Sequence, residues 1–589
     1  MEQIINMQCL LVKYILKNKL HGKKIAIKGC GIHTEKLLSL IKDELEVVCI
    51  IANEAKISVL DIPIVRNEEF AVYNPDVIIL SSYKFRHDMQ EDLLKCNVPN
   101  TIEIVDIYEE LSKAGLVLSH EFFVYQVADT NIEKYLKLSN VFCMAVENRG
   151  GVGDVILDSL FLKELRRILP KEAILHYYTK PYHVMDDMPF VTQCLELKDK
   201  KSPKQYDLYL DMRRLPLIVH MNEERVKKEV PLLYQFCRKY KELLEKDFLN
   251  SIQCGLYMNY ARFMGKIRLD EINLFGLFAI GRNARRYMYI KESAIDFFES
   301  GALHGKKYIT VNRAVDASET DKHPKLWPLE YYNELLARIK KEFPEILIVQ
   351  IGGKASVELE NVDVSLVGKT TLEEVKPILK YGLLHIDIEG GLVHLNSFLY
   401  GKSLVLFGPT DEGYYGYPEN INLAVHEPCT NGCEGMTEFW AKKCLLADSP
   451  LCMRALKPEY VFEKVRAQLV SYKEKEIQEI IFNGDNSQEV RSLVQTTKKY
   501  AIYGKGSLPF IGNVNETVLV ICDNGEVTLV EYVDEYNIPM YDNEFEIILC
   551  QGEYTEYTTR ELRRGLCPGG TLVTSSVGYA DFLEKFVNN

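Results

Sequence analysis

Short apolar segments that run into a glycine turn and then into a helix-like segment recur along the chain. Residues 23–31 (KKIAIKGCG), 141–154 (VFCMAVENRGGVGD) and 382–391 (GLLHIDIEGG) all have this pattern. Apolar runs of this length suit the buried strands of a parallel sheet, whose connections are usually helices. The sequence therefore predicts an α/β protein built from Rossmann-like units.

The chain has 589 residues, which is long enough for about four domains. We expect a Rossmann-like N-terminal domain over residues 1–125 and two central α/β domains over 138–300 and 306–470. A fourth α/β domain is expected over residues 496–589. The polar and charged stretch SYKEKEIQEI, from residue 471, is expected to be a helical linker.

The composition indicates which classes of partner and which cellular location are expected for the protein. Asp and Glu (84) exceed Lys and Arg (71), which gives a formal net charge of −13 and disfavours nucleic acid as a partner. Because no apolar stretch reaches the ~18 residues of a membrane-spanning helix, we expect no transmembrane segment. The first 20 residues predict an amphipathic helix and not a signal peptide. Fifteen cysteines without that signal favour a reducing, cytoplasmic location.

A first candidate site is the glycine turn Gly29-Cys30-Gly31, which is followed by Thr34 at the start of a helix. A glycine turn there can bring a phosphate to the N–H groups of the helix start. Thr34 stands where a dinucleotide-binding turn has its third glycine. The alternative is a tight structural turn without a ligand.

A second candidate lies in the loop Arg149-Gly150-Gly151-Val152-Gly153-Asp154, between a strand and an amphipathic helix. Gly151 and Gly153 leave room at the mouth of a cleft. A carboxylate placed there can remove a proton from an acceptor hydroxyl. Alternatively, Asp154 only caps the helix, where its charge favours the helix dipole.

A third group of residues suits a diphosphate. Lys325 precedes Trp327-Pro328 and a long helix, and a loop lysine can pair with a phosphate. Gly390 and Gly391 free backbone N–H groups at the start of the next helix, and Glu389 can accept hydrogen bonds from ribose hydroxyls. We assign donor-binding roles also to three further residues: His394, Asn312 at the end of a strand, and Thr410 in the loop Phe407-Gly408-Pro409-Thr410. A packing histidine is the alternative for His394.

In their order and spacing these motifs resemble glycosyltransferase family 9, the ADP-heptose:lipopolysaccharide heptosyltransferase family, over residues 140–468. The resemblance implies a GT-B fold, in which two Rossmann-like domains face each other across a cleft. It also implies inverting sugar transfer without a catalytic metal. Asp154 matches the family's general base, Lys325 the lysine at the donor phosphates, and Gly390, Gly391 and His394 the donor-binding loop. The segment EGGLVH is most similar to that of autotransporter (protein) heptosyltransferases.

Four cysteines, Cys429, Cys433, Cys444 and Cys452, have the spacing C-x3-C-x10-C-x7-C. Four thiolates are sufficient ligands for a tetrahedral zinc or iron ion. The autotransporter heptosyltransferases that the chain resembles carry a cysteine-bound iron in this region, so the resemblance implies a structural metal, for which iron and zinc both stay open. Four free or partly buried thiols are the alternative.

The C-terminal region resembles the later half of a class I methyltransferase in two segments, FEIIL (545–549) and ELRRGLCPGGTL (561–572). Upstream, only Gly504-Lys505-Gly506 stands near the place of the methyl-donor loop. A degenerate methyltransferase-like domain used for packing or partner binding is therefore the preferred interpretation.

Together these features predict an inverting glycosyltransferase that moves a heptose or related sugar from a nucleotide-activated donor, such as ADP-heptose, to a hydroxyl of a protein or a surface glycan. Two alternatives stay open. One is a non-catalytic, Rossmann-rich scaffold that binds partners, and the other is a bifunctional glycosyltransferase–methyltransferase. The sequence also leaves open whether the chain forms a homo-oligomer.

Overall fold

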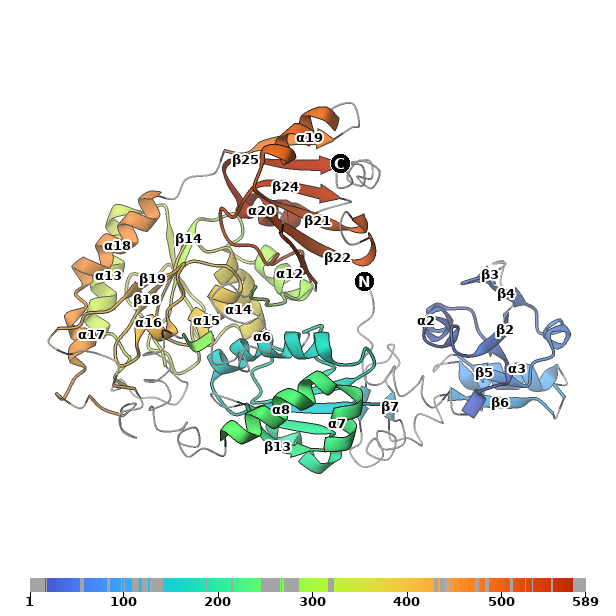
Figure 1. The fold of residues 1–589 in the computed structure, drawn as a ribbon. Coiled ribbons are helices and arrows are strands. Elements are labelled where there is room, and N and C mark those ends of the chain that lie inside the picture. Colours follow the sequence, from blue (N-terminus) through green and yellow to red (C-terminus); the bar gives the residue numbers. More distant parts are fainter. Residues whose placement is uncertain are drawn as a thin grey trace.

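The computed structural model describes residues 19–52, 58–81, 85–96, 101–107, 141–186, 188–212, 216–244, 285–315, 323–427, 446–471, 476–482, 487–508, 512–524, 526–531, 533–551 and 555–575, with residues 16, 98–99, 116–118, 125–127, 265, 267–269, 429, 433–434, 440 and 442–444. Over these residues the chain forms four sheets of five or six strands and one two-stranded ribbon (Figure 1). The predicted α/β class is confirmed.

The first core domain (residues 141–244) is built on a sheet with the strand order β11-β10-β9-β12-β13. All neighbours are parallel except the edge pair β12–β13. Every residue of β9 is buried, as expected for the central strand of a sheet covered on both faces. Its elements are β9 (Cys143–Asn148), α6 (Val152–Ile168), β10 (Ile174–Thr179), β11 (Gln193–Glu196), η2 (Leu197–Asp199), η3 (Pro203–Gln205), β12 (Leu208–Met212), β13 (Pro216–Met221), α7 (Glu223–Glu229) and α8 (Pro231–Leu244).

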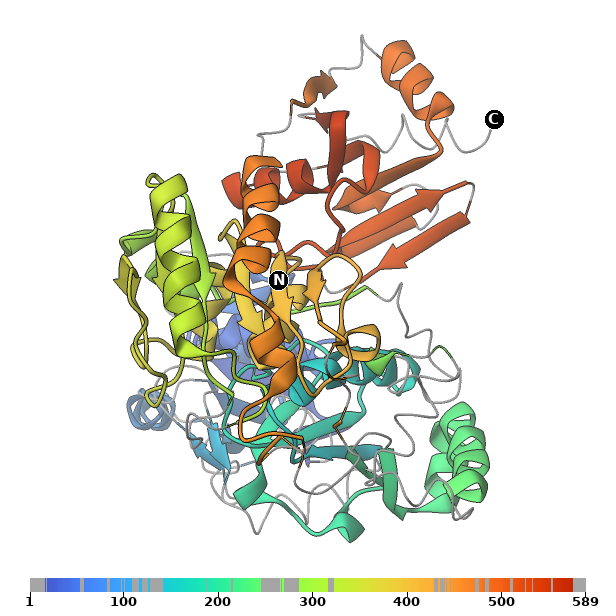
Figure 2. The same ribbon diagram turned by 90° about the vertical axis from the view of Figure 1, so that its left-hand side faces the viewer.

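The second core domain (residues 292–471) has a six-stranded, wholly parallel sheet in the order β16-β15-β14-β17-β18-β19. Figure 2 shows α13 and α18 side by side on this domain, where they pack against each other. Its elements are α12 (Glu292–Ser300), β14 (Tyr308–Val311), α13 (Leu329–Glu342), β15 (Leu347–Gln350), β16 (Val364–Ser365), α14 (Leu372–Lys380), β17 (His385–Ile388), α15 (Gly391–Phe398), β18 (Ser403–Leu406), α16 (Glu412–Tyr415), β19 (Ile421–Leu423), α17 (Leu451–Ala455) and α18 (Pro458–Ser471).

The strand orders determine where a ligand can enter each core domain. In the first, the chain order reverses between β9 and β12; in the second, it reverses between β14 and β17. Loops that leave the carboxyl ends of two such strands diverge and open a crevice. The loops concerned follow Asn148 and Met212 in the first domain, and Val311 and Ile388 in the second.

The two core domains share one hydrophobic core. Helix α6 packs against α15, and Leu157 and Leu160 of α6 belong to the same buried cluster as Leu395 and Phe398 of α15. The apolar face of α6 that the sequence shows is therefore buried between the domains as well as against its own sheet.

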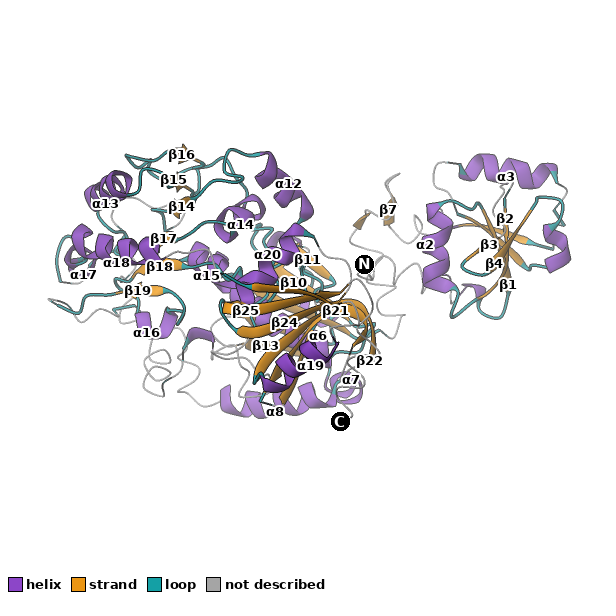
Figure 3. Cartoon of the chain, turned by 90° about the horizontal axis from the view of Figure 1, so that it is seen from above, coloured by secondary structure: helices purple, strands orange, loops and turns teal. Residues whose placement is uncertain are grey.

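The N-terminal sheet has the order β3-β4-β2-β1-β5-β6 and is parallel except for the pair β3–β4. Helices α2 and α3 flank it (Figure 3). The elements are β1 (Lys24–Lys28), α2 (Ile32–Ile41), β2 (Glu46–Ile51), β3 (Ser58–Val59), β4 (Ile62–Val65), η1 (Phe70–Tyr73), β5 (Val77–Leu80), α3 (Arg86–Lys95) and β6 (Glu103–Asp106), followed by the ribbon β7 (Leu116–Leu118)–β8 (Tyr125–Val127).

The C-terminal domain (residues 476–575) has the strand order β20-β25-β24-β21-β22-β23. Strands β20, β25, β24 and β21 are parallel, whereas β21, β22 and β23 form an antiparallel meander. Its elements are β20 (Gln478–Phe482), α19 (Ser487–Thr496), β21 (Lys499–Leu508), β22 (Gly512–Asp523), β23 (Glu526–Val530), β24 (Phe545–Gln551), α20 (Glu556–Gly565) and β25 (Leu566–Ser575).

Two expectations for this region change. The prediction of a helical linker is wrong for Gln478–Phe482, which forms β20, because pairing with the distant strand β25 satisfies its backbone groups. The domain therefore begins about 20 residues before the expected residue 496. Gly504 and Gly506 lie inside β21, whose next strand begins at Gly512. This hairpin leaves no space for a methyl-donor loop and helix after β21.

Among the described residues, no helix is long and apolar enough to cross a membrane. The predicted amphipathic helix over the first 20 residues lies mostly outside the described part of the chain.

Candidate functional site

The glycine loops of the two core domains meet. A Cβ atom on Gly153, in the first turn of α6, would lie 2.5 Å from Cδ2 of His394 on α15. A Cβ atom on Gly391, the first residue of α15, would lie 3.0 Å from the Cβ of Val152. Both positions therefore need glycine because the helix starts approach each other too closely for a side chain. Two motifs that are far apart in the sequence thus lie in contact.

Asp154 lies at the start of α6. Its Oδ2 accepts a hydrogen bond from the Gly151 N–H at 3.0 Å, and its Oδ1 accepts one from Arg268 Nη2, also at 3.0 Å. Its side chain is 43% exposed, so a substrate can reach the carboxylate. Removal from water opposes ionisation, but Arg268, the Gly151 N–H and His394 outweigh it and hold the pKa of Asp154 below its usual value. Asp154 both caps the helix and presents an ionised carboxylate.

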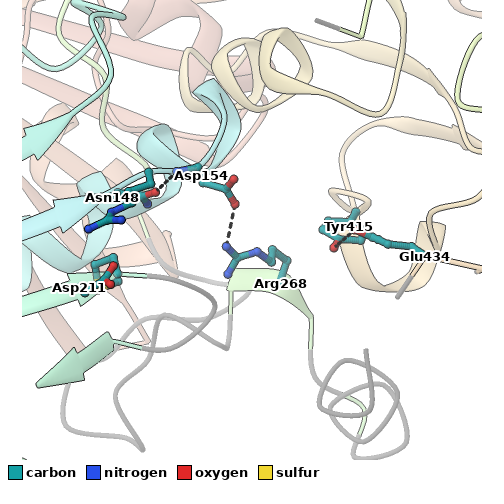
Figure 4. A pocket seen from close by; sticks show the side chains of 9 residues that line it. Asn148, Asp154, Asp211, Arg268, Tyr415 and Glu434 are labelled. Carbon is teal, nitrogen blue, oxygen red and sulfur yellow. Dashed lines mark hydrogen bonds and ion pairs between the residues drawn. The ribbon is translucent and has the colours of Figure 1, made fainter. Parts of the chain in front are cut away.

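A cleft of about 430 Å³ opens beside Asp154. Figure 4 shows Asp154 and Arg268 paired on one side of it and Tyr415 and Glu434 on the other. The lining residues come from the carboxyl ends of β9 and β12, from the loop after β9 and the first turn of α6, from Arg268, and from the second core domain: Asn148, Arg149, Gly150, Asp154, Asp211, Met212, Arg268, Tyr415 and Glu434. The crevice predicted by the strand order of the first core domain is therefore present.

Lys325 and Glu389 form a buried ion pair in the second core domain. Lys325 Nζ lies 2.5 Å from Glu389 Oε2, and the two side chains are 16% and 7% exposed. Burial opposes ionisation of Glu389, but Lys325 and His394 outweigh it and hold the pKa of the carboxyl far below its usual value. Both groups are therefore charged, and each neutralises the other beside the start of α15.

His394 links this ion pair to the first turn of α6. Its Nε2 lies 3.7 Å from Glu389 Oε1, and its Nδ1 is 2.7 Å from the hydroxyl of Tyr417. The ring is buried and packs against Gly153. The structure therefore places His394 at the junction of the two glycine loops, where it packs and also makes polar contacts.

Asn312 and Thr410 follow β14 and β18 at the same edge of the sheet. Asn312 Nδ2 donates to both carboxylate oxygens of Asp387 at 3.0 Å, inside the domain. Burial raises the pKa of Asp387, although His385 and Asn312 act against this rise. The Thr410 hydroxyl is buried and has no hydrogen-bond partner within the described residues. Asn312 therefore supports the strand ends from within.

Several residues of the cleft carry no sequence motif. Arg268 is 114 positions from Asp154, and Tyr415 donates to Glu434 Oε1 at 3.0 Å on the opposite wall. Asn148 is held by Asp158, whose Oδ2 accepts from Asn148 Nδ2 at 2.7 Å. Burial raises the pKa of Asp158 to about 7. Asn148 could have been found from the sequence as a polar residue at the end of a central strand.

The cysteine segment reaches the cleft through Glu434, whose N–H donates to the carbonyl of Pro409 at 3.0 Å. The sulfur of Cys452 is buried, and burial together with the charges of Cys429, Cys433 and Cys444 raises its pKa to about 12. The four thiols thus share one neighbourhood. In the part of the chain that the structure describes, however, no three Cys, His, Asp or Glu side chains are grouped as metal ligands.

In the N-terminal domain the glycine turn is occupied by the protein's own polar groups. The Thr34 hydroxyl donates to the Gly29 carbonyl at 2.7 Å and lies 2.7 Å from the Ser81 hydroxyl. Gly29 has φ = +110°, which favours glycine. These contacts account for the turn as a structural feature.

Residues 291–434 match glycosyltransferase family 9 (heptosyltransferase). This part of the chain, most of the second core domain, is therefore similar to that family. The matched range contains Lys325, Glu389, Gly390, Gly391 and His394, whereas Asp154 lies before it. A second match, to the family described as C2185-like, N-terminal, covers residues 21–104.

Solved structures that match the chain include several glycosyltransferases. One is the glycosyl transferase family 9 protein from Veillonella parvula DSM 2008, with 15% identity, 56% of this chain and 98% of that chain covered, and a TM-score of 0.38. Another is the E. coli ADP-heptose lps heptosyltransferase II, with 14% identity, 56% of this chain and 99% of that chain covered, and a TM-score of 0.36. A third is the iron-containing dodecameric glycosyltransferase TibC from enterotoxigenic E. coli H10407, with 11% identity, 56% of this chain and 77% of that chain covered, and a TM-score of 0.37. No curated protein sequence matches the chain.

Proposed function

We propose that the protein is an inverting glycosyltransferase that moves a heptose or a related sugar from a nucleoside diphosphate donor, such as ADP-heptose, to a hydroxyl of a protein or surface glycan. The observation that carries this proposal is the contact between the two glycine loops, which brings Asp154 near the start of α15 and within electrostatic range of Lys325. The family match over residues 291–434 supports it.

In this proposal the second core domain holds the donor. The N-terminus of α15 offers backbone N–H groups and the positive end of the helix dipole to the diphosphate. Lys325 has three N–H donors, so it can keep its bond to Glu389 and also donate to a phosphate oxygen. Glu389 can accept hydrogen bonds from ribose hydroxyls. Thr410, on the neighbouring loop, offers a hydroxyl that has no hydrogen-bond partner among the residues that the structure describes.

The reaction is a single displacement. The acceptor oxygen forms a bond to the anomeric carbon while the bond from that carbon to the diphosphate oxygen breaks, and the electron pair leaves with the diphosphate. Asp154 takes the proton of the acceptor hydroxyl, which requires the ionised carboxylate that its lowered pKa provides. The departing diphosphate is stabilised by the positive end of the α15 helix dipole and by a hydrogen bond from Lys325, which keeps its ion pair with Glu389. The proposal assigns no catalytic step to a metal.

We also propose that Cys429, Cys433, Cys444 and Cys452 take up a structural iron or zinc ion. Their shared neighbourhood and their spacing support this, but the sulfurs would have to move closer together to form a site. Through Glu434 the segment touches the cleft wall, so metal binding would stabilise that wall. We also propose that the protein is located in the cytoplasm, as its cysteine content leads us to expect.

The test is an assay of nucleoside diphosphate release from ADP-, GDP- and UDP-sugars, with and without candidate hydroxyl acceptors. We expect release from at least one donor. If the wild-type chain binds a nucleotide but releases none, a non-catalytic scaffold becomes the better account. Binding of S-adenosylmethionine by the full chain would favour the bifunctional alternative, against which the β21–β22 hairpin argues.

A further inference from the structure

The linker between the two core domains, residues 285–290, is held by a loop of the C-terminal domain. We call this loop, residues 533–544, the docking loop. The Ile290 N–H donates to Asp534 Oδ2 at 2.8 Å, and Asn537 Nδ2 donates to the Met288 carbonyl at 2.9 Å. The backbone of the linker is therefore fixed by side chains that lie about 245 positions later in the sequence.

Helix α14 holds the same linker from the second core domain. Lys376 Nζ donates to the Tyr289 carbonyl at 2.7 Å and to the Val184 carbonyl of the first core domain at 3.3 Å. At the start of the linker, Arg285 donates to Glu544 Oε2 at 2.5 Å. Three successive linker residues, 288 to 290, thus each have a backbone group bonded to a side chain outside the linker.

The docking loop also reaches α15. Asn537 Nδ2 donates a second hydrogen bond to the carbonyl of Phe398, the last residue of α15, at 3.1 Å. Its Oδ1 accepts from Lys380 Nζ on α14 at 2.8 Å. Asn537 is fully buried. One side-chain amide therefore joins the linker to α15, whose first turn carries Gly391 and His394.

The C-terminal domain is docked through buried charges. Lys380 Nζ lies 2.8 Å from Glu561 Oε2, and the two side chains are 2% and 3% exposed. Arg564 lies 2.9 Å from the same oxygen. Removing one partner of a buried pair leaves an uncompensated charge. The interface is therefore suited to permanent contact, and Figure 1 shows the C-terminal domain against the second core domain.

We infer that Asn537 is a positioning residue: it fixes the interdomain linker against the end of α15 and so maintains the close approach of α15 and α6. The inference rests on the proposed function for the role of α15 in donor binding. In this inference the C-terminal domain supports the donor-binding helix α15 through Asn537. The domain then has a role in the transferase without catalysing a reaction itself.

The test is hydrogen exchange of the full chain carrying Asn537→Asp. This substitution keeps the acceptor for Lys380 and removes the donor to Met288 and Phe398. Asn543→Asp, the same change at an exposed position of the docking loop, is the control. We expect amides of residues 286–290 and of the end of α15 to exchange about tenfold faster in Asn537→Asp, because buried carbonyls lose their partners. Exchange in β24 and β25 should stay unchanged.

Unchanged exchange in the linker and in α15 would overturn the inference. So would equal acceleration in the linker, β24 and β25, since that would show a general loss of stability. If the wild-type chain transfers sugar, KM for the donor should rise in Asn537→Asp more than kcat falls. If the wild-type chain transfers none, the proposed function fails, while the exchange measurement still decides the role of Asn537.

Discussion

Replacing Asp154 by Asn tests the assignment of the general base. The amide oxygen of Asn can still accept from the Gly151 N–H, so the cap of α6 is retained. The lost charge removes the ion pair with Arg268. It also removes a favourable interaction with the helix dipole, and that interaction is worth only about 0.3–1 kcal/mol. We therefore expect the variant to fold. Loss of a general base slows a reaction ~10²–10⁴-fold, which raises the barrier by about 3–5 kcal/mol.

The assay is the rate of nucleoside diphosphate release at saturating donor, with nucleotide affinity measured in parallel. Asp296→Asn, at an exposed position of α12, is the matched control and should keep the wild-type rate. Because the pKa of Asp154 is held below its usual value, its carboxylate is the form present above pH ~4. The loss should then be similar at any pH between about 5 and 8. A variant that keeps the wild-type rate while binding nucleotide would refute the assignment.

Three further outcomes are expected. Lys325→Gln should weaken the affinity for a nucleoside diphosphate, measured by calorimetry, by about tenfold or more, because a charge-assisted hydrogen bond to phosphate is lost. An unchanged affinity would mean that the diphosphate binds elsewhere. Gly153→Ala should lower the free energy of unfolding, measured in urea, by about 1–3 kcal/mol, because the added Cβ would clash with His394. An unchanged midpoint of urea unfolding would mean that the starts of α6 and α15 do not lie in contact as described. Cys429→Ser combined with Cys433→Ser should lose bound iron or zinc in elemental analysis, and equal metal content in the variant and the wild type would exclude the proposed metal site.

The α/β class and the central motifs could be predicted because their causes are local. A strand, a glycine turn and a helix stand next to one another in the sequence at Gly153 and at Gly391. Parallel strand order then brings loops at the carboxyl ends of neighbouring strands together. That Gly153 would pack against His394 could not be predicted, since it depends on how two separate sheets are oriented.

The residues that the sequence did not reveal are joined by long-range contacts. Arg268 lies in a stretch without a motif, and only the fold brings it to Asp154. Strand β20 was expected to be a helix because its charged residues favour one, but pairing with β25 determines its conformation. Asn537 has no motif either, and its role depends on three partners that are between 139 and 249 positions away.

The central claim is that the two glycine loops form one site for donor and acceptor. A crystal structure of the chain with a non-reacting nucleotide-sugar analogue tests it most directly. The account predicts the diphosphate beside Lys325 and the start of α15, with the anomeric carbon facing Asp154. An analogue bound at the turn of Gly29 and Gly31, or one whose anomeric carbon faces away from Asp154, would contradict it.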